Sequence, residues 1–302
     1  MNRVPRVSVI IATYNRPQTL LEALQSVCSQ TYDSWECVVV NDGGTNVRLA
    51  LEGLHDERIR YLDKQHGGYP AAANLGLSVA RGEYVSYLGD DDRWYPNHLT
   101  TCIDFLDRDH NTGLVYTKQL RRGFVWSDRQ RVIVEDYLEP LSEFSWPRLI
   151  DGNWIPITSV VHRSQLIEQS GPFKDLPILE DWEFLLRLCS IAKVAHIPII
   201  TGEYYSDLTR ESRNEKMKKE NPRQYHKTIE DIRNSYGSRD VREAERPLDY
   251  FPERFVLYSL FAGKGSIGLA LRMASYYYLY SRLWGRKAAF KKLWRRLQSF
   301  QK

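Results

Sequence analysis

Short apolar runs alternate with amphipathic segments over the first third of the chain. Residues 7–13 are rich in β-branched side chains, which is the composition of a strand buried on both faces of a parallel sheet. From Pro17 onward, leucine and valine recur at helical spacing, so a helix is predicted there. The alternation continues with predicted strands at 35–40, 58–62 and 84–88 and predicted helices at 47–54 and 71–80. Such a pattern is typical of an α/β domain with a doubly wound, mainly parallel sheet.

The pattern of the following residues is less regular, and we expect this part of the sheet to be less parallel. The predicted elements are helices at 98–108, 164–169, 181–190 and 225–235, strands at 114–117, 154–162 and 194–200, and a hairpin at 123–137. Residues 206–222 are almost wholly polar. This composition predicts a mobile loop that orders over a substrate.

A basic tail follows this body. Of the 42 basic residues, 11 lie after Glu253, whereas all 38 acidic residues lie at or before it. Within the tail, aromatic and leucine side chains recur at helical spacing from Phe290 to Phe300, and lysine and arginine take the other side. This pattern is typical of a helix in a membrane interface that contacts anionic lipid. A helix docked on the acidic body or on a second subunit remains an alternative. We predict a domain at 1–222 and a helical extension at 223–302.

Composition and cysteine spacing narrow the class of protein. A hydrophobic content of 42% and a charged content of 26% are those of an ordinary globular protein. The four cysteines form no Cys-x-x-Cys pair, the first residues lead directly into a strand, and no uninterrupted apolar run has the length of a membrane span. We therefore expect a cytoplasmic protein that lies peripherally on the inner face of the cell membrane, with no nucleic-acid partner.

Three consecutive aspartates, Asp90 to Asp92, directly follow a predicted strand. Adjacent carboxylates raise one another's pKa unless a positive charge lies among them, so the run predicts a site for a divalent cation. An alternative is that Asp92 caps the helix that begins near Pro96, while the other two aspartates are solvated. Thr13 and Asp42 follow two other predicted strands, and parallel sheets bind ligands beyond the carboxyl ends of their strands.

Five segments in order along residues 6–205 carry a resemblance to a known family. They read Ser8-Val-Ile-Ile-Ala-Thr-Tyr-Asn-Arg16, Val38-Val-Val-Asn-Asp-Gly43, Ala72-Ala-Asn-Leu-Gly76, Gly82-Glu-Tyr-Val-Ser-Tyr-Leu-Gly-Asp-Asp-Asp92 and Leu179-Glu-Asp-Trp-Glu183. With these segments the chain resembles the family 2 glycosyltransferases, which are inverting sugar transferases with the GT-A fold. One such motif is weak support, but five in the family's order are strong.

The resemblance implies a nucleotide site at the predicted strand ends. The implied nucleotide-binding residues are Thr13, Tyr14, Arg16, Asp42, Asn74 and Asp90. Thr13 and Tyr14 would hold the base and Asp90 the ribose. Asp42 would accept a hydrogen bond from the imide N–H of uracil or thymine, because a carboxylate acts only as an acceptor.

The resemblance also implies a metal site, with Asp91 and Asp92 as ligands of Mn²⁺ or Mg²⁺. Hard oxygen ligands suit either cation, and the cation would neutralise charge on the departing nucleoside diphosphate. Two positions depart from the family's pattern. Ala73 stands where an arginine usually precedes the asparagine, and Gly89 replaces the first carboxylate of the Asp-x-Asp signature. The second departure leaves the metal and ribose to Asp90 and Asp91, or to Asp90 and Asp92.

Asp181 matches the family's catalytic base, which takes the proton of the acceptor hydroxyl as that hydroxyl attacks the sugar. The residues also have a structural interpretation, because acidic side chains are favoured in the first turn of a helix. Candidates for contacts with the acceptor or the donor sugar are Trp154, Glu180 and Trp182.

The sequence therefore predicts a metal-dependent glycosyltransferase of the hexosyltransferase type. The expected donor is a UDP- or dTDP-sugar, and the expected acceptor is a hydroxyl of a lipid-linked glycan in surface polysaccharide synthesis. A non-catalytic module that binds nucleotide-sugar or glycan is one alternative, which the presence of Asp181 disfavours. A sugar nucleotidyltransferase is another, but it needs a glycine-rich loop where this chain has Tyr14-Asn-Arg-Pro17.

Overall fold

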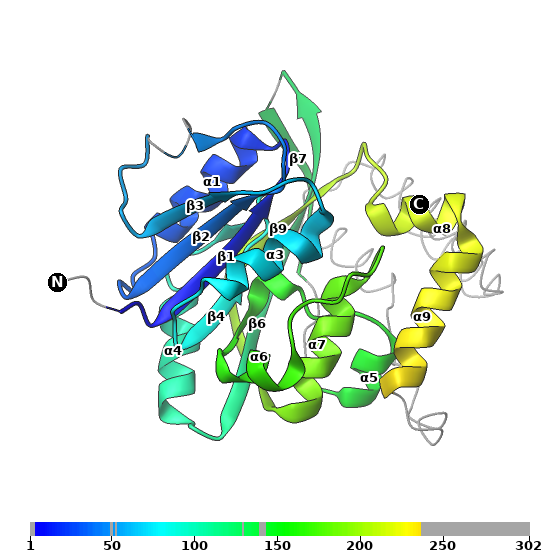
Figure 1. Ribbon diagram of the computed structural model, residues 1–302. Helices are drawn as coiled ribbons and strands as arrows, with labels where there is room; N and C mark the ends of the chain where they lie inside the picture. The colour runs from blue at the N-terminus through cyan, green and yellow to red at the C-terminus, as the bar shows by residue number, and fades with distance from the viewer. Residues whose placement is uncertain (1–3, 49–50, 52, 129, 139–142, 237–302) are drawn as a thin grey trace, which may run out of the picture. The chain divides into compact units, whose positions relative to one another are not determined.

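The computed structural model describes residues 4–48, 51, 53–128, 130–138 and 143–236 (Figure 1). In this part of the chain the strands form one mixed sheet in the order β3-β2-β1-β4-β8-β6-β9-β5, and β7 pairs with β6 outside that path. The strands are β1 (Val7–Thr13), β2 (Trp35–Asn41), β3 (Ile59–Asp63), β4 (Tyr84–Tyr87), β5 (Arg93–Trp94), β6 (Thr112–Ser127), β7 (Gln130–Leu138), β8 (Val160–Arg163) and β9 (Lys193–Asp207). The helices are α1 (Pro17–Cys28), α3 (Gly68–Ser78), α4 (His98–Arg108), α5 (Trp146–Asp151), α6 (Gln165–Ser170), α7 (Glu180–Ile191), α8 (Arg213–Glu220) and α9 (Pro222–Tyr236), with a 3-10 turn, η1 (Ile157–Ser159).

Strands β1 to β4 are parallel to one another, as the sequence predicted. Thr13 pairs in register with Asn41, and Ile10 pairs with Tyr87. The carboxyl ends of β1, β2 and β4 therefore meet at one edge of the sheet. On the other side of β4, β8 runs antiparallel between β4 and β6, which makes the second half of the sheet less parallel.

The two faces of the sheet bury two separate hydrophobic cores. Successive side chains of a strand point to opposite faces, so Val9 and Ile11 pack with helices α1 and α4, whereas Ile10 packs with α3 and α7. Figure 1 shows α1 and α3 on opposite sides of strands β1 to β3. This covering of both faces explains why the β1 and β2 runs are apolar throughout rather than alternating.

Two predicted elements differ from the observed ones. The strand expected at 154–162 is confined to β8, because Pro156 begins a turn. In this turn the Pro156 carbonyl accepts hydrogen bonds from the Ser159 backbone amide, at 2.9 Å, and from Ser159 Oγ, at 2.6 Å. The polar segment at 206–222 is not one loop, since α8 occupies its centre. Ser212 and Glu215 form a capping box at the start of α8, and a box of this kind can be recognised in the sequence.

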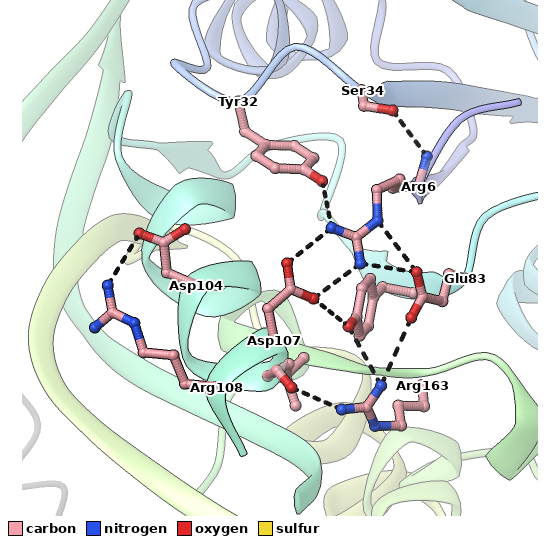
Figure 2. Close-up of polar contacts among 10 residues, drawn as sticks. Arg6, Tyr32, Ser34, Glu83, Asp104, Asp107, Arg108 and Arg163 are labelled. Atoms are coloured by element: carbon pink, nitrogen blue, oxygen red, sulfur yellow. Dashed lines mark hydrogen bonds and ion pairs between the residues drawn. The ribbon is translucent and has the colours of Figure 1, made fainter. Parts of the chain in front are cut away.

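A network of ion pairs ties the amino ends of β1 and β4 to α4 and to the carboxyl end of the antiparallel strand β8 (Figure 2). Arg6 lies between Glu83 and Asp107, at 2.8 Å and 2.7 Å respectively, and Tyr84 donates to Asp107 at 2.7 Å. The hydrogen bond from Arg6 lowers the pKa of Asp107 to about 2. Arg163 of β8 joins the network through Glu83 at 3.7 Å. The network fastens β1, β4, β8 and α4 at the edge opposite to the polar strand ends.

Helix α9 packs on the same body. The Tyr236 hydroxyl donates to Glu183 of α7 at 2.6 Å, and Arg233 donates to the Asp151 carbonyl at the end of α5. The predicted domain boundary at 222 stays a prediction. The predicted membrane-interface helix at 290–300 lies outside the described residues. Within those residues, no helix has the length and apolar character needed to cross a membrane.

Candidate active site

Residues from the ends of β1 and β4 converge on the aspartate run. Thr13 Oγ1 donates to Asp90 Oδ2 at 2.9 Å. Arg16, just before α1, donates from Nη1 to Asp90 Oδ1 at 2.9 Å and to Asp91 Oδ2 at 2.6 Å. The predicted site residues Thr13 and Arg16 thus both contact Asp90. Arg16 also contacts Asp91, which is the more exposed of the two aspartates.

Asp92 occupies the space beside Gly89. Its carboxylate is buried, and Oδ1 accepts a hydrogen bond from the Tyr205 backbone amide of β9 at 2.9 Å. A Cβ atom on Gly89 would lie 2.5 Å from Asp92 Oδ2, closer than such contacts occur. Burial, followed by the charge of Asp91, raises the pKa of Asp92 well above its usual range. The glycine is therefore a packing requirement of the turn, and Asp92 fixes the turn to β9.

The donor chemistry of this turn fits a divalent cation. Burial raises the pKa of Asp90 to about 6, and the positive charge of Arg16 opposes that shift, so a cation at this position favours the ionised carboxylate. Within the described residues, no group of three or more His, Cys, Asp or Glu side chains is arranged to hold a metal by itself. Magnesium-type sites commonly use one or two carboxylates plus substrate phosphates, and Asp90 and Asp91 supply that number.

Arg131 reaches the same turn from the β6–β7 hairpin. Its Nη1 donates to the Asp91 carbonyl at 2.7 Å, and its guanidinium lies 4.4 Å from the ring centre of Tyr205 and 5.2 Å from that of Phe124. The side chain is only 7% exposed. No sequence pattern indicated this residue, because it follows the aspartates by 40 positions and arrives through strand pairing.

Asp42, the predicted acceptor for a base, holds residues 64–68 in place. Its carboxylate accepts from Lys64 Nζ at 2.6 Å, Gly67 N at 3.0 Å and Gly68 N at 2.8 Å. His66 Nδ1 lies 2.8 Å from Oδ2 and 3.1 Å from the Asp42 carbonyl oxygen. The hydrogen bond from Lys64 contributes most to lowering the Asp42 pKa, against the effect of burial.

Tyr14 lies beside this cluster, at the predicted base position. Its ring is 46% exposed and stacks on His66, with a centroid distance of 4.4 Å. The pair offers a flat, exposed aromatic surface next to Asp42, and flat surfaces of this kind suit a nucleobase.

Asn74, a predicted nucleotide contact, bonds with the backbone of Phe173. Its Nδ2 donates to the Phe173 carbonyl at 2.8 Å, and its Oδ1 accepts from the Phe173 amide at 2.8 Å. Both ends of the amide are thus engaged by one residue, 99 positions away. The side chain joins α3 to the segment before α7.

Asp181 lies in the first turn of α7. The helix begins after Leu179, whose backbone is left-handed, with φ 61°. Asp181 Oδ1 accepts from the Trp182 amide at 2.8 Å, and Oδ2 accepts from Asn153 Nδ2 at 2.9 Å. Burial, and then the charge of Glu180, raises the pKa of Asp181 to about 6. A carboxylate with this pKa is a suitable general base near neutral pH.

The three residues predicted to contact the donor sugar or the acceptor differ in burial. Glu180 is 3% exposed and forms an ion pair with Arg213 of α8, and Trp182 is 2% exposed and donates from its indole to the Leu149 carbonyl at 2.6 Å. Neither offers a surface to a sugar. Trp154 is half-buried, and the guanidinium carbon of Arg148 lies 4.1 Å from the centre of the Trp154 ring. Asn153, which the sequence did not indicate, is the exposed residue that contacts Asp181.

Burial raises the pKa of Tyr69 in α3 far above its usual range, and the negative charges of Asp181 and Glu180 add to this effect, with a smaller contribution from Asp92.

This arrangement is the GT-A fold of glycosyltransferases. The chain is similar to TarS 1-349 of S. aureus in complex with UDP-GlcNAc, with a TM-score of 0.55, 18% identity and coverage of 89% of this chain and 70% of that one. It is also similar to the mannosyltransferase PcManGT of Pyrobaculum calidifontis in complex with GDP-Man and Mn²⁺, with a TM-score of 0.56, 18% identity and coverage of 96% and 85%. At this identity the likeness concerns the fold alone.

The model of the family "Glycosyl transferase family 2" matches residues 8–160, just over half of the 302 residues, and the chain belongs to this family. The putative colanic acid biosynthesis glycosyl transferase WcaA of Escherichia coli K12 is 35% identical over 198 residues, which are 62% of this chain and 67% of WcaA. An uncharacterized glycosyltransferase of Rickettsia felis is 30% identical over 201 residues, which are 63% of this chain but 32% of that protein. The chain thus spans about a third of the length of the R. felis relative.

Proposed function

We propose that the protein transfers a sugar from a UDP- or dTDP-sugar to an acceptor hydroxyl with inversion of the anomeric configuration. The observation that supports the proposal is the different character of two carboxylate groups, the Asp90–Asp91 pair and Asp181. Asp90 and Asp91 contact a cationic side chain at a strand edge, whereas Asp181 is held by hydrogen bonds with its pKa near 6. One group suits a diphosphate with its counter-ion, and the other suits a hydroxyl that loses a proton.

Asp181 acts as the general base in this proposal. With a pKa of about 6, it is mainly ionised at neutral pH yet basic enough to accept a proton from an attacking hydroxyl. Asn153 orients the carboxylate through Oδ2, and the Trp182 amide fixes the other oxygen. Direct attack by the activated hydroxyl on the face opposite the nucleotide inverts the anomeric carbon. The proton passes to Asp181, and the bond to the nucleoside diphosphate breaks.

Asp90 and Asp91 are the residues that would hold Mn²⁺ or Mg²⁺, with Asp92 securing the turn. When bound, the cation supplies charge neutralisation for the departing diphosphate. The exposed Tyr14 face and the neighbouring residues 64–68 would hold the base. An imide recognised by Asp42 would share the carboxylate with Lys64, whose Nζ lies 2.6 Å from Oδ1.

The proposed acceptor is a lipid-linked glycan of a surface polysaccharide, at the cytoplasmic face of the cell membrane. Two observations support this choice: the name of WcaA refers to colanic acid biosynthesis, and the sequence places 11 basic residues and no acidic ones after Glu253. A basic amphipathic segment favours contact with anionic lipid.

The function is tested by thermal-shift measurements with UDP, dTDP, GDP, CDP and ADP, each with and without Mn²⁺, followed by assays of nucleotide-sugar turnover. We expect UDP or dTDP with Mn²⁺ to stabilise the wild type and Asp181→Asn but not Asp91→Asn, and Asp181→Asn to lack turnover. Asp104→Asn is the matched control, because Asp104 is an exposed aspartate of α4 that pairs with Arg108 (Figure 2). Nucleotide binding without turnover by the wild type would instead support a binding module. The absence of any nucleotide binding would refute both.

A further inference from the structure

Arg16 takes the position of a bridging cation between two carboxylates. One nitrogen, Nη1, contacts both Asp90 Oδ1, at 2.9 Å, and Asp91 Oδ2, at 2.6 Å. A guanidinium usually pairs with one carboxylate through two nitrogens. Here one nitrogen of the cationic side chain contacts the carboxylates of both aspartates. A metal ion bound between two carboxylates makes the same kind of contact.

The local backbone places Arg16 at this point although the helix does not favour it. Arg16 is the N-cap of α1, a position that prefers Ser, Thr, Asp or Asn and whose dipole disfavours a positive charge. Asn15, with φ 57°, precedes it, and Asn15 Oδ1 accepts from Thr45 N at 2.7 Å. Pro17 follows it at the first helical position. The backbone on both sides of Arg16 is thus constrained. The stabilisation that Arg16 provides comes from its ion pairs with the two carboxylates.

The Arg16 side chain is much more exposed than the Asp90 carboxylate that it contacts. Half of its side chain is exposed, at 50%, while the Asp90 side chain is only 9% exposed and is also bonded to Thr13. The other nearby guanidinium, that of Arg131, contacts the Asp91 carbonyl and not the carboxylate. Among the described residues, Arg16 is the cationic side chain that bonds with Asp90 and Asp91.

We propose that Arg16 is an internal counter-cation that occupies the divalent-metal position and is exchanged for the metal when the donor binds. The two cations use the same carboxylate oxygens and repel each other, so they compete for the site. After the exchange, the released guanidinium faces the diphosphate that arrives with the metal, and the two have complementary charge. Arg16 therefore lowers the affinity of the site for the metal ion in the absence of the donor, and it couples metal binding to donor binding. The inference rests on the metal-dependent transfer proposed above.

The test is the binding of Mn²⁺ alone, without nucleotide, to the full-length protein by isothermal titration calorimetry. We expect Arg16→Gln to bind Mn²⁺ about tenfold more tightly than the wild type, because the competing charge is gone. Arg16→Lys keeps the charge and stays close to the wild type. Arg93→Gln is the matched control, because it removes the same charge one position from Asp92, where Arg93 pairs with Glu22 and not with the aspartates.

A second readout uses stability. Without metal, Arg16→Gln is expected to have a lower Tm than the wild type, and added Mn²⁺ should raise its Tm by more. Asp91→Asn in the Arg16→Gln background should remove the gain in Mn²⁺ affinity. Equal or weaker Mn²⁺ binding by Arg16→Gln would overturn the exchange.

The two proposals fail separately. Turnover of a nucleotide-sugar by the wild type, together with unchanged Mn²⁺ affinity in Arg16→Gln, refutes the exchange alone. Tighter Mn²⁺ binding in that variant without any turnover by the wild type supports the exchange and refutes the transferase.

Discussion

Asn153 Nδ2 donates a hydrogen bond of 2.9 Å to Asp181 Oδ2, and this contact sets the direction of the carboxylate that we propose as the base. Asn153 lies in the loop after α5, and Asp181 lies 28 residues later in the first turn of α7. The base is therefore oriented by a residue that has no acid–base chemistry of its own.

Replacing Asn153 tests this orientation. In Asn153→Ala the carboxylate loses one of its two fixed contacts, and we expect kcat to fall about 10- to 100-fold, as for a misplaced catalytic group. The KM for the donor should stay unchanged, because Asn153 is not among the residues proposed to hold the nucleotide. Steady-state kinetics check both values, with exposed Asn111→Ala as the control. A change in the donor KM with a normal kcat would contradict the assigned role.

The dependence of rate on pH reports Asp181. Proton transfer requires the ionised carboxylate, so kcat should rise with pH through about 6 and then level off. Glu180 raises the Asp181 pKa through its charge, and Arg213 lowers it. In Glu180→Gln the negative charge is gone and the positive charge remains, so the rise should move to lower pH. A pH–rate series on the two proteins decides the matter, and a rise at unchanged or higher pH would exclude Asp181 as the titrating group.

Gly89 and Asp92 should behave as a coupled pair. In Gly89→Ala the new Cβ lies 2.5 Å from Asp92 Oδ2, and we expect a loss of about 1–3 kcal/mol in the free energy of unfolding, which is typical of overpacking. In Asp92→Ala the space is open, so adding Gly89→Ala should then cost much less. Chemical denaturation of the four proteins measures the coupling. Additive costs would show that the two side chains do not share the space.

Asn74 should matter for stability and not for donor binding. Asn74→Ala leaves the Phe173 amide and carbonyl without their partner, and we expect a loss of about 1–3 kcal/mol in the free energy of unfolding. Asn74→Asp keeps the acceptor and loses the donor, so its cost should be intermediate. Calorimetric UDP affinities should agree among the three proteins. A selective loss of UDP binding in folded Asn74→Ala would restore the role that the family pattern implies.

Much of the fold could be predicted because apolar periodicity is a local property. The runs that became β1, β2 and β4 are buried on both faces, and the sequence shows this directly. It also placed Thr13 and Asp90 at adjoining strand ends, which the structure confirms with a hydrogen bond of 2.9 Å. The helix α8 was missed because polar composition outweighed the capping box at Ser212 and Glu215.

The remaining site residues could not be predicted, because their contacts depend on the packed fold. Arg131 reaches Asp91 only because β7 folds back on β6, and Asn153 reaches Asp181 through a loop. The contacts of Asp42 with the Gly67 and Gly68 amides likewise depend on how residues 64–68 close over its carboxylate. Burial of Trp182 likewise became visible only once α7 was packed against α5.

The network around Arg6 joins the amino ends of β1 and β4, while Thr13 and Asp90 meet beyond the carboxyl ends of the same two strands. A substitution of Thr13 therefore leaves the contacts of the Arg6 network in place. The attachment of the two strands at one end is separable from changes in the polar side chains at the other.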